Sequence, residues 1–407
     1  MGKSLPEGYE IRGAEANQTE AVLDYLEVVM NAPREYFACI YRNFPGDVPA
    51  HSRIALADGR IVAHVHAFPI DFWMNGVRVP GMMIGDVSTH PDHRRKGLGT
   101  LLLQDACRHG CEAHGATFAL LKSGVAHFYS AAGWDVLPMT SWRIDVAGFD
   151  VRAEVARLDE TAAEAMKRYQ VRRFERAEEL GRIANIHEEQ NRGRSLTVIR
   201  SWDYWRRHFY WSSHHEVESL FLVAEMNGSV VAYSRANAGR LTEMGCLPEH
   251  APAAFALLES TIRQLRKRDA GSFQVLVPED HGLWALLSAS ENAEAAEHRG
   301  HWLRQIDWAG MLAYFEVAFR ERAKRAGIEP ARPVTLSMGA QTVTLPLPSA
   351  SEDAATTCDL ELNQIDAFRL VTGAVRGSSL TDDAELGKLL DSLFEEDSPI
   401  FWPMDVV

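Results

Sequence analysis

The chain has 407 residues, 46% of them hydrophobic and 24% charged, a composition that is typical of a soluble globular protein and excludes a disordered one. Its formal net charge of −14 argues against nucleic acid as a partner and favours a small cationic substrate, because phosphate binding draws on clustered Lys and Arg. There is no signal-like N-terminus, no apolar run of about 18 residues and no CxxC pair, so we expect a cytoplasmic protein with reduced cysteines and no membrane contact.

The length predicts two or three domains, and the order of the predicted elements favours three. Apolar residues recur at helical spacing over 20–30. Two hairpins follow, with turns at Asp58-Gly59 and Asn75-Gly76, dipeptides that favour tight turns. Next come a strand over 82–87, a helix over 97–114, a strand over 117–121 and a short helix ending near Gly133. This α+β order with one crossover places a ligand at the turn between the first of these strands and the helix.

The middle of the chain repeats this order of elements. A helical run over 161–184 opens it, and a hairpin that turns at Asn227-Gly228 echoes the first hairpin. The tripeptide Pro248-Glu249-His250 matches Pro91-Asp92-His93, and a helix and then a strand over 274–277 follow it. The repetition predicts a duplicated domain.

After Trp308 the pattern changes again. A helix over 311–326 leads to two alternating stretches, 334–338 and 341–345, which predict a strand pair. Helical segments near 365–372 and 383–394 complete a smaller α+β domain. The expected domains are therefore 1–148, 149–309 and 310–407.

The most informative motif lies between strand and helix in the first copy. It reads Val87-Ser-Thr-His-Pro-Asp-His-Arg-Arg-Lys-Gly-Leu-Gly-Thr100. A strand end, a basic run and glycines that open a helix aim successive backbone N–H groups at one point, which is a ready site for a pyrophosphate. Gly97 and Gly99 permit close approach, since a Cβ at either position would crowd the anion. The alternative is a basic turn that caps a helix, and neither a Walker nor a Rossmann glycine pattern is present.

The hexapeptide Arg94-Arg95-Lys96-Gly97-Leu98-Gly99 resembles the pyrophosphate loop of the GNAT acetyltransferases: Arg or Gln, two variable residues, Gly, one residue, then Gly or Ala. The resemblance implies a GNAT fold with acetyl-CoA as co-substrate. It implies that the loop N–H groups bind the pyrophosphate, and that the strand end pairs with the pantetheine arm and polarises the thioester carbonyl near Val87. The implied cofactor-binding residues are Val87, Ser88, Thr89, Arg94, Arg95, Lys96, Gly97, Leu98, Gly99, Thr100 and Ser123.

A second motif supplies a candidate acid. The stretch Phe128-Tyr129-Ser-Ala-Ala-Gly133-Trp134 is similar to the FYxxxGF pattern of GNAT enzymes, whose tyrosine lies on a short helix after the next strand. The resemblance makes Tyr129 the general acid that protonates the departing CoA thiolate. The alternative is a tyrosine that only packs beside Phe128.

The second copy differs at the loop. It reads Ala251-Pro-Ala-Ala-Phe-Ala256, with no basic pair and no glycine, and Pro252 removes an N–H. We therefore expect this copy to have lost cofactor binding. Two GNAT domains, the second degenerate, followed by an α+β tail look like the Eis family. That resemblance implies a sterol-carrier-protein-like third domain, a homo-oligomer such as a hexamer, and acetylation of amines that include aminoglycosides.

The end of the chain carries one further implied role. In the Eis family the C-terminal carboxylate reaches into the active site and helps to deprotonate the amine. This chain ends with Phe401-Trp402-Pro403-Met404-Asp405-Val406-Val407, so Val407 would supply that carboxylate. The alternative is a terminus that is only docked.

No metal is expected, because the histidines near the motifs show no metal-binding spacing and GNAT chemistry needs no ion. These histidines are His64, His66, His90, His93 and His127. The expected function is transfer of acetyl from acetyl-CoA to a small cationic amine. A protein or peptide lysine acetyltransferase and a non-catalytic acyl-CoA or lipid-binding protein are the alternatives, and no motif identifies the amine.

Overall fold

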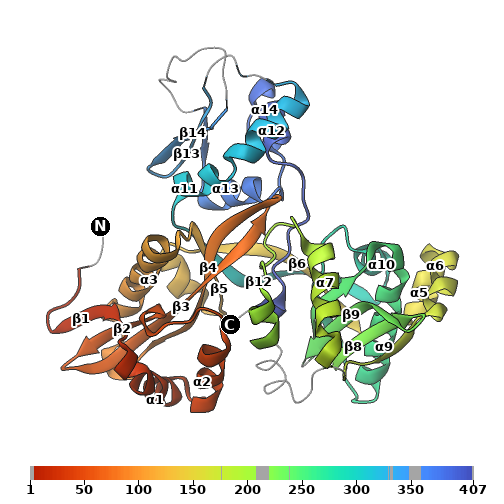
Figure 1. Ribbon diagram of the computed structural model, residues 1–407, viewed down its shortest axis with the longest axis horizontal. Coiled ribbons are helices and arrows are strands. Elements are labelled where there is room, and N and C mark those ends of the chain that lie inside the picture. Colours follow the sequence, from red (N-terminus) through yellow and green to blue (C-terminus); the bar gives the residue numbers. More distant parts are fainter. Residues whose placement is uncertain are drawn as a thin grey trace. The chain divides into compact units, whose positions relative to one another are not determined.

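The structure is a computed structural model that describes residues 4–175, 177–207, 220–237, 239–328, 330, 333–347 and 359–405. The chain divides into two compact units (Figure 1), which we describe separately. Unit 1 contains Met1–Leu137 and Arg299–Asp397, and unit 2 contains Pro138–His298 and Ser398–Val406. Among the described residues, no helix combines the length and apolar character needed to cross a membrane.

The sheet of unit 1 begins as an antiparallel meander and ends with a crossover. Its strands are β1 (Tyr9–Gly13), β2 (Ser52–Ala57), β3 (Arg60–Met74), β4 (Val77–Thr89) and β5 (Phe118–Lys122). Neighbours from β1 to β4 are antiparallel, whereas β5 lies parallel to β4. On the far side of β5, residues 301–305 of β12 (Ala293–Gln305) pair with it in antiparallel fashion. The strands predicted from Arg53 to Leu121 are present, whereas β1 and the pairing of β12 with β5 were not predicted.

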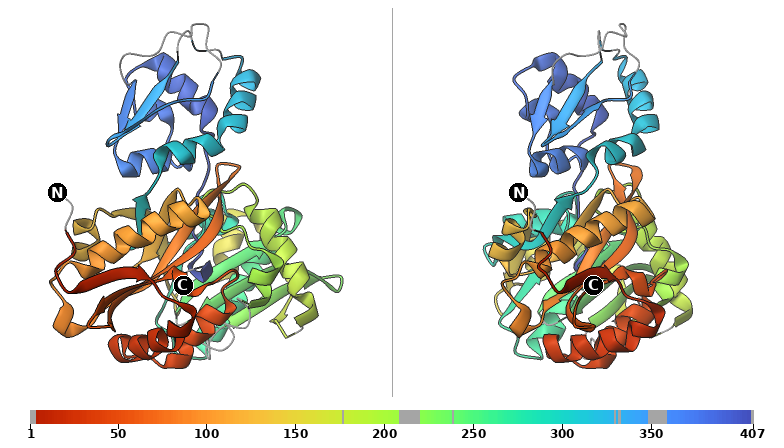
Figure 2. Two further views of the ribbon diagram at one scale, coloured as in Figure 1. Left: turned by 60° about the vertical axis from the view of Figure 1, so that its left-hand side comes forward. Right: turned by 90° about the vertical axis from the view of Figure 1, so that its left-hand side faces the viewer.

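Helices cover both faces of this sheet (Figure 2). They are η1 (Ala16–Gln18), α1 (Thr19–Met30), α2 (Arg34–Asn43), η2 (Pro49–His51), η3 (Pro91–His93), α3 (Leu98–His114) and α4 (Ala126–Ala131). Helix α3 lies on one face and α1 with α2 on the other (Figures 1 and 2). Leu98, Leu102 and Ala106 recur at helical spacing and are buried in the core between α3 and the sheet. This amphipathic face positions the helix N-terminus at the end of β4.

Two tight turns set the register of the meander. Asp58 and Gly59 have φ values of 48° and 72°, and Asn75 and Gly76 have φ values of 48° and 79°. Consecutive left-handed residues are what a two-residue hairpin turn of this twist needs. The predicted hairpins are confirmed at both turns.

The rest of unit 1 is a small α+β part. It contains α11 (Trp308–Tyr314), α12 (Glu316–Ala326), β13 (Thr335–Met338), β14 (Gln341–Thr344), β15 (Leu360–Leu362), α13 (Gln364–Val371), η7 (Gly377–Ser379) and α14 (Ala384–Leu393). Its sheet has the order β14-β13-β15, so the predicted strand pair is present. The predicted helix over 311–326 is instead two helices that meet at Phe315. Arg322 donates to the Asn75 side chain at 2.7 Å, which joins this part to the β3–β4 turn.

Unit 2 repeats the order of the first copy. Its elements are α5 (Val151–Leu158), α6 (Glu160–Ala165), η4 (Met166–Arg168), β7 (Gln170–Arg173), η5 (Ala177–Glu179), α7 (Leu180–Asn191), β8 (Leu220–Met226), β9 (Ser229–Asn237), β10 (Arg240–Cys246), η6 (Pro248–His250), α9 (Pro252–Arg266), β11 (Ser272–Val275), α10 (Gly282–Ala289) and η8 (Pro403–Asp405). Strands β7 to β10 are antiparallel neighbours, and β11 is parallel to β10. Residues 142–145 of β6 (Asp135–Asp145) pair with β11. The predicted duplication is thus visible strand by strand.

One helix prediction was wrong in this unit. The run over 161–184 contains the strand β7, which pairs in register with β8 from Gln170 opposite Glu225 to Arg173 opposite Leu222. Backbone pairing along that edge, with Arg172 bonded to Glu225, overrides the helical pattern of charges. The strand corresponds to β1 of the first copy.

A pair of contacts repeats between the copies. Tyr9 of β1 lies 2.9 Å from His93 Nδ1, measured from its hydroxyl oxygen, and the two rings meet edge to face. Tyr169, just before β7, makes the same contact with His250 Nδ1 at 3.3 Å. The matched tripeptides form η3 and η6 in the two copies, so their alignment in the sequence was correct.

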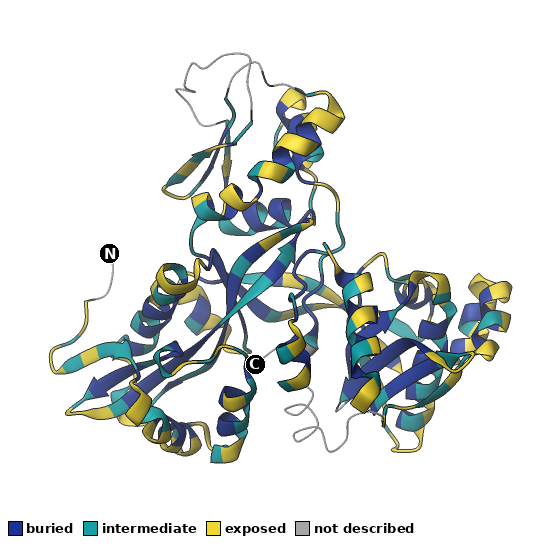
Figure 3. Ribbon diagram, in the orientation of Figure 1, coloured by how far each residue is buried: buried dark blue, intermediate teal, exposed yellow. Residues whose placement is uncertain are grey.

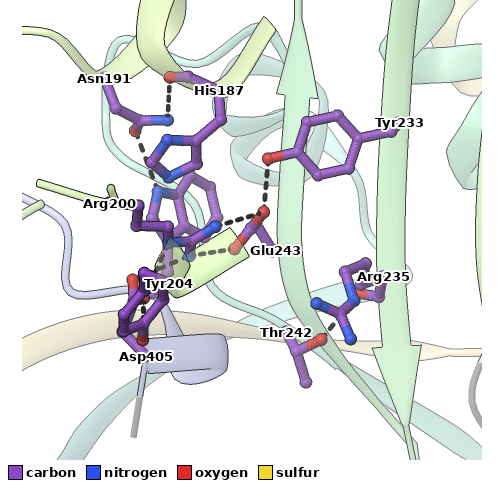
Figure 4. A network of polar contacts seen from close by, with 10 residues as sticks. His187, Asn191, Arg200, Tyr204, Tyr233, Arg235, Thr242, Glu243 and Asp405 are labelled. Carbon is purple, nitrogen blue, oxygen red and sulfur yellow. Dashed lines mark hydrogen bonds and ion pairs between the residues drawn. The ribbon is translucent and has the colours of Figure 1, made fainter. Parts of the chain in front are cut away.

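The core of unit 2 contains a buried ionic network (Figure 4). Arg200 bonds through Nε and a terminal nitrogen to both carboxylate oxygens of Asp405 at 2.9 Å, and through its terminal nitrogens to Glu243. Tyr204 donates to Asp405 at 3.0 Å. The side chains of Arg200, Glu243 and Asp405 are at most 1% exposed. Burial alone would raise the pKa of Glu243, but the Arg200 guanidinium outweighs it and lowers the pKa to about 2.

Burial follows the strands in each unit (Figure 3). Every residue of β5 before Lys122 is buried, as are most of β9 and β10. The cores therefore lie between sheets and helices, and the polar turns at the strand ends are left exposed to ligands.

Candidate active site

Strands β4 and β5 separate at the point where the site begins. They pair only from Met82 opposite Ala119 to Ile84 opposite Leu121. Beyond Ile84, β4 continues to Thr89 and keeps its pairing with β3 on the other side. Within the described part of the chain, the edge of β4 from Gly85 to Thr89 that faces β5 therefore has no strand partner. It can offer backbone N–H and C=O groups to an extended ligand.

A β-bulge lies in the open part of β4. His64 pairs with Ser88 and His66 with Gly85, so Asp86 and Val87 together oppose one residue of β3. Asp86 adopts a left-handed conformation with φ of 51°. His64 Nδ1 lies 3.1 Å from the Asp86 carbonyl oxygen and is fully buried. Burial lowers the pKa of His64 to about 3, so the ring is neutral and can donate from Nδ1 to hold the bulge.

The Asp86 side chain makes a second group of contacts. Tyr41 donates to the Asp86 carboxylate at 2.8 Å. Tyr36 lies nearby: burial raises the pKa of the Tyr36 phenol, and the charge of Asp86 raises it further. Burial raises the pKa of Asp86, and the Tyr41 hydrogen bond opposes part of that rise. A carboxylate among two phenols at the bulge can bind a cation or accept a proton from one.

The loop after β4 has the conformation that the motif predicts for an anion cradle. After η3, the four residues 94–97 lead into α3. Arg95 and Gly97 are both left-handed, with φ of 63° and 85°. Alternation of left-handed residues in front of a helix turns successive N–H groups to one side, and the helix dipole adds to their attraction for an anion. A β-branched residue at position 97 would be strained in this conformation.

The basic side chains of the loop have partners within unit 1. Arg94 donates from Nε to the Thr89 carbonyl oxygen at 3.1 Å, which ties the loop to the end of β4. Lys96 donates from Nζ to the Tyr9 hydroxyl at 2.6 Å and lies over that ring. The loop is therefore braced at both ends by its own charged residues.

The structure shows a packing reason for the small residue at Gly99. A Cβ at this position would lie 3.0 Å from Cζ of Phe128 and 3.7 Å from Oγ1 of Thr89. The small residue lets the first turn of α3 pack against the Phe128 ring of α4. A larger residue at position 99 would therefore crowd the Phe128 ring.

Tyr129 lies on α4 in the same hydrophobic core as Leu98, with Val87 packed against that core. It is 6% exposed and lies edge to face with Phe128 and near Trp302. Burial raises its pKa, and a hydrogen bond with Ser123 opposes the rise. The phenol is therefore protonated at neutral pH, as a proton donor must be.

The other predicted residues divide into three groups. Ser88, Thr89, Leu98 and Thr100 lie on β4 and on the first turn of α3, around the loop. Ser123 follows β5, accepts a hydrogen bond from the Val125 backbone and receives one from Trp302 on its carbonyl oxygen. Val407 lies outside the described residues. Asp86 and Tyr41 were missed, because the motif reading covered the loop and the pattern for a bulge is too short to stand out in a sequence.

The corresponding turn of unit 2 lacks the cradle. Only Ala251, with φ of −45°, stands between η6 and α9, and α9 begins with Pro252. None of the described residues from 247 to 256 has a positive φ. Of the two turns compared, only the first has the left-handed residues that the predicted anion site requires.

Residues 10–137 match the family model described as an acetyltransferase (GNAT) domain. This region is a GNAT domain. The predicted membership in the GNAT superfamily is thereby confirmed for the part of the chain that holds the splayed strands and the loop. The family supports N-acyltransferase activity that depends on an acyl-CoA.

Solved structures extend the likeness to the whole chain. A GCN5-related N-acetyltransferase from Anabaena variabilis is 12% identical with a TM-score of 0.68, and the match covers 98% of this chain and 100% of that one. One from Kribbella flavida is 18% identical, with a TM-score of 0.64 and 98% of each chain covered. Eis1 from Mycobacterium abscessus is 14% identical, with a TM-score of 0.61 over 96% of this chain and 98% of its own.

At these identities the likeness shows a shared fold, and it confirms the predicted resemblance to the Eis architecture at that level. A sequence search of curated proteins found no significant match.

Proposed function

We propose that the GNAT domain transfers acetyl from acetyl-CoA to a small cationic amine. The observation that carries the proposal is the pairing of an open β4 edge with a left-handed cradle at the start of α3. The open edge is suited to an extended pantetheine amide chain, and the cradle is suited to a pyrophosphate. Bound acetyl-CoA would supply an activated thioester next to the bulge.

The residues then have separate tasks. The N–H groups from Arg95 to Thr100 hold the pyrophosphate, and residues 87–89 align the pantetheine arm. The Val87 N–H at the bulge polarises the thioester carbonyl. Tyr129 donates a proton to the leaving thiolate, and its raised pKa keeps that proton available.

Asp86 extends the scheme to the acceptor. An amine is mostly protonated at neutral pH and must lose a proton before it can attack the thioester. The Asp86 carboxylate would attract the ammonium group and accept its proton, with Tyr41 orienting the acid oxygen at 2.8 Å. The formal net charge of the chain, −14, adds a weak long-range attraction for cations.

The test is a panel of acceptors assayed by release of CoA, with aminoglycosides, polyamines and lysine peptides side by side. We expect turnover with small polycationic amines. Turnover confined to lysine peptides would instead favour a protein acetyltransferase. Acetyl-CoA binding without turnover of any amine would favour the non-catalytic binder.

Several finer parts of the proposal rest on the Eis resemblance. They are the division into domains 1–148, 149–309 and 310–407, a sterol-carrier-protein-like third domain, a homo-oligomer such as a hexamer, and a catalytic carboxylate at Val407. Light scattering tests the oligomer, since a monomer of 45.4 kDa would exclude it.

The terminal carboxylate needs a careful deletion. Asp405 belongs to the buried network of Arg200, so removing it would disturb unit 2 as well. Removal of Val406 and Val407 alone tests the carboxylate without that damage. Normal turnover by this truncated chain would leave Asp86 as the proton acceptor.

A further inference from the structure

A cluster of histidines lies in the GNAT domain away from the cofactor loop. His51 ends η2, while His109 and His114 lie near the end of α3. One ring nitrogen of each lies within 4.8 Å of the other two. Helix α3 has 17 residues and ends at His114. At about 1.5 Å per residue, His114 is about 25 Å from the cradle at the start of the helix.

The carboxylate of Asp47 determines which nitrogen of His51 is free. Its Oδ1 lies 3.1 Å from His51 Nδ1 and 2.9 Å from His66 Nε2. The carboxylate can only accept, so both ring nitrogens donate to it. The contact at His51 is shorter than the 3.4 Å contact from the Val48 backbone nitrogen, which supports a hydrogen on Nδ1. The Nε2 of a neutral His51 then carries a lone pair.

That lone pair points into the cluster. His51 Nε2 and His114 Nε2 are 3.0 Å apart. Two nitrogens bound to one tetrahedral Zn²⁺ at about 2.0–2.1 Å lie roughly 3.3 Å apart, so this separation is close to that of a shared ion. A hydrogen bond between two neutral rings would also fit this single distance, and the third histidine therefore decides between them.

His109 supplies the decisive observation. Its Nε2 is buried and has no hydrogen-bond partner among the described residues. An unpaired nitrogen in such a place costs free energy unless a ligand satisfies it.

The surroundings suit a cation. Arg53 lies near His109, but it is paired with Asp105 at 2.5 Å, and Arg108 is paired with the same carboxylate. The carbonyl end of α3 adds the negative pole of the helix dipole. His114 is exposed, which gives an ion a path from solvent and room for a water ligand.

We propose that His51, His109 and His114 bind one Zn²⁺, with water as the fourth ligand and with Asp47 orienting His51. Three imidazoles and a water form a ligand set that zinc favours, and a carboxylate behind a ligating histidine is the usual outer partner. The ion would join η2 to the end of α3. Asp47 also bonds His66, which stacks on Tyr41 at 4.2 Å, so the ion would brace the segment that carries Tyr41.

The experiment uses the full chain without an affinity tag, freed of metal by a chelator and titrated with Co²⁺ followed by visible absorption. We expect one tetrahedral Co²⁺ per chain, displaced by Zn²⁺, and a higher thermal midpoint with Zn²⁺. His109→Gln and His114→Gln should abolish this binding, and Asp47→Asn should weaken it by about 10- to 100-fold. His127→Gln, an exposed histidine outside the cluster, is the control and should bind normally.

The thermal midpoint of each variant in chelator shows whether it has folded. His114 is exposed, so His114→Gln is the variant least able to disturb the core. Absence of saturable Co²⁺ binding by the unaltered chain would overturn the proposal. Normal binding by His114→Gln together with loss in His66→Gln would overturn it as well, because the ion would then occupy Asp47, His51 and His66.

Discussion

The turns from β4 to α3 and from β10 to α9 begin alike and end differently. Each starts with a Pro-acid-His 3₁₀ turn whose histidine meets a tyrosine of the edge strand. The first turn then inserts 94–97 with two left-handed residues, whereas the second passes through Ala251 alone. The shared contacts belong to the scaffold. The short insertion supplies the left-handed residues on which the proposed anion site depends.

The largest expected effect comes from the insertion itself. Gly97→Val would force a β-branched residue to a φ of 85° and should abolish acetyl-CoA binding. Ala251→Val, at the matched turn of unit 2, should leave the affinity unchanged because its φ of −45° suits any residue. Equilibrium binding of acetyl-CoA measures both. An equal loss of acetyl-CoA affinity in the two variants would mean that both substitutions destabilise the fold and that the turn before α3 has no special part in cofactor binding.

The next effect concerns the acid. Tyr129→Phe should lower kcat by about 10² to 10⁴ and leave acetyl-CoA affinity nearly unchanged, because only the proton is lost. The contribution should fade only at alkaline pH, since burial raises the pKa of this phenol. Tyr314→Phe, on an exposed tyrosine, serves as the control in the same assay. An unchanged kcat would make Tyr129 a packing residue.

A smaller effect is expected at the bulge. Asp86→Asn should lower kcat/KM for the amine by about 10²-fold near pH 7. Because the pKa of Asp86 is raised, the unaltered enzyme should lose activity on acidification at a higher pH than an ordinary aspartate would cause. In the Asp86→Asn variant, the activity should not fall over this acidic range of pH. If the fall in activity on acidification persists in Asp86→Asn, another group is the proton acceptor.

The smallest effect on cofactor binding is expected from unit 2. Arg200→Met leaves two buried carboxylates without their cation and should lower the free energy of unfolding by roughly 3–5 kcal/mol. Acetyl-CoA affinity should remain unchanged. Arg192→Met, which breaks an exposed pair with Glu188, should cost at most about 0.5 kcal/mol. Chemical denaturation measures both variants, and a loss of affinity in Arg200→Met would give unit 2 a role beyond scaffold.

Much of this architecture could be predicted because local signals agreed with the fold. The Asp-Gly and Asn-Gly turns, the helical apolar spacing of α3 and the matched Pro-acid-His tripeptides all act over short distances. The loop motif could be read for the same reason. Strand β7 could not, because its pairing with β8 is set by residues about 50 positions away.

The missed site features share that cause. Asp86 becomes important through a bulge against His64 and through Tyr41, which lies 45 residues earlier. The histidines considered for a metal in the sequence lie near the motifs, whereas the proposed ligands His51 and His114 are 63 residues apart and have no local spacing to reveal them. Tertiary contacts assemble both groups.

The number of acetyl-CoA molecules bound per chain shows whether one turn or both turns bind the cofactor. Calorimetric titration of the full chain should give a stoichiometry of one, since only the turn before α3 has the left-handed cradle among the two turns compared. A stoichiometry near two, or one site that survives in Gly97→Val, would contradict a single cofactor site at the turn before α3.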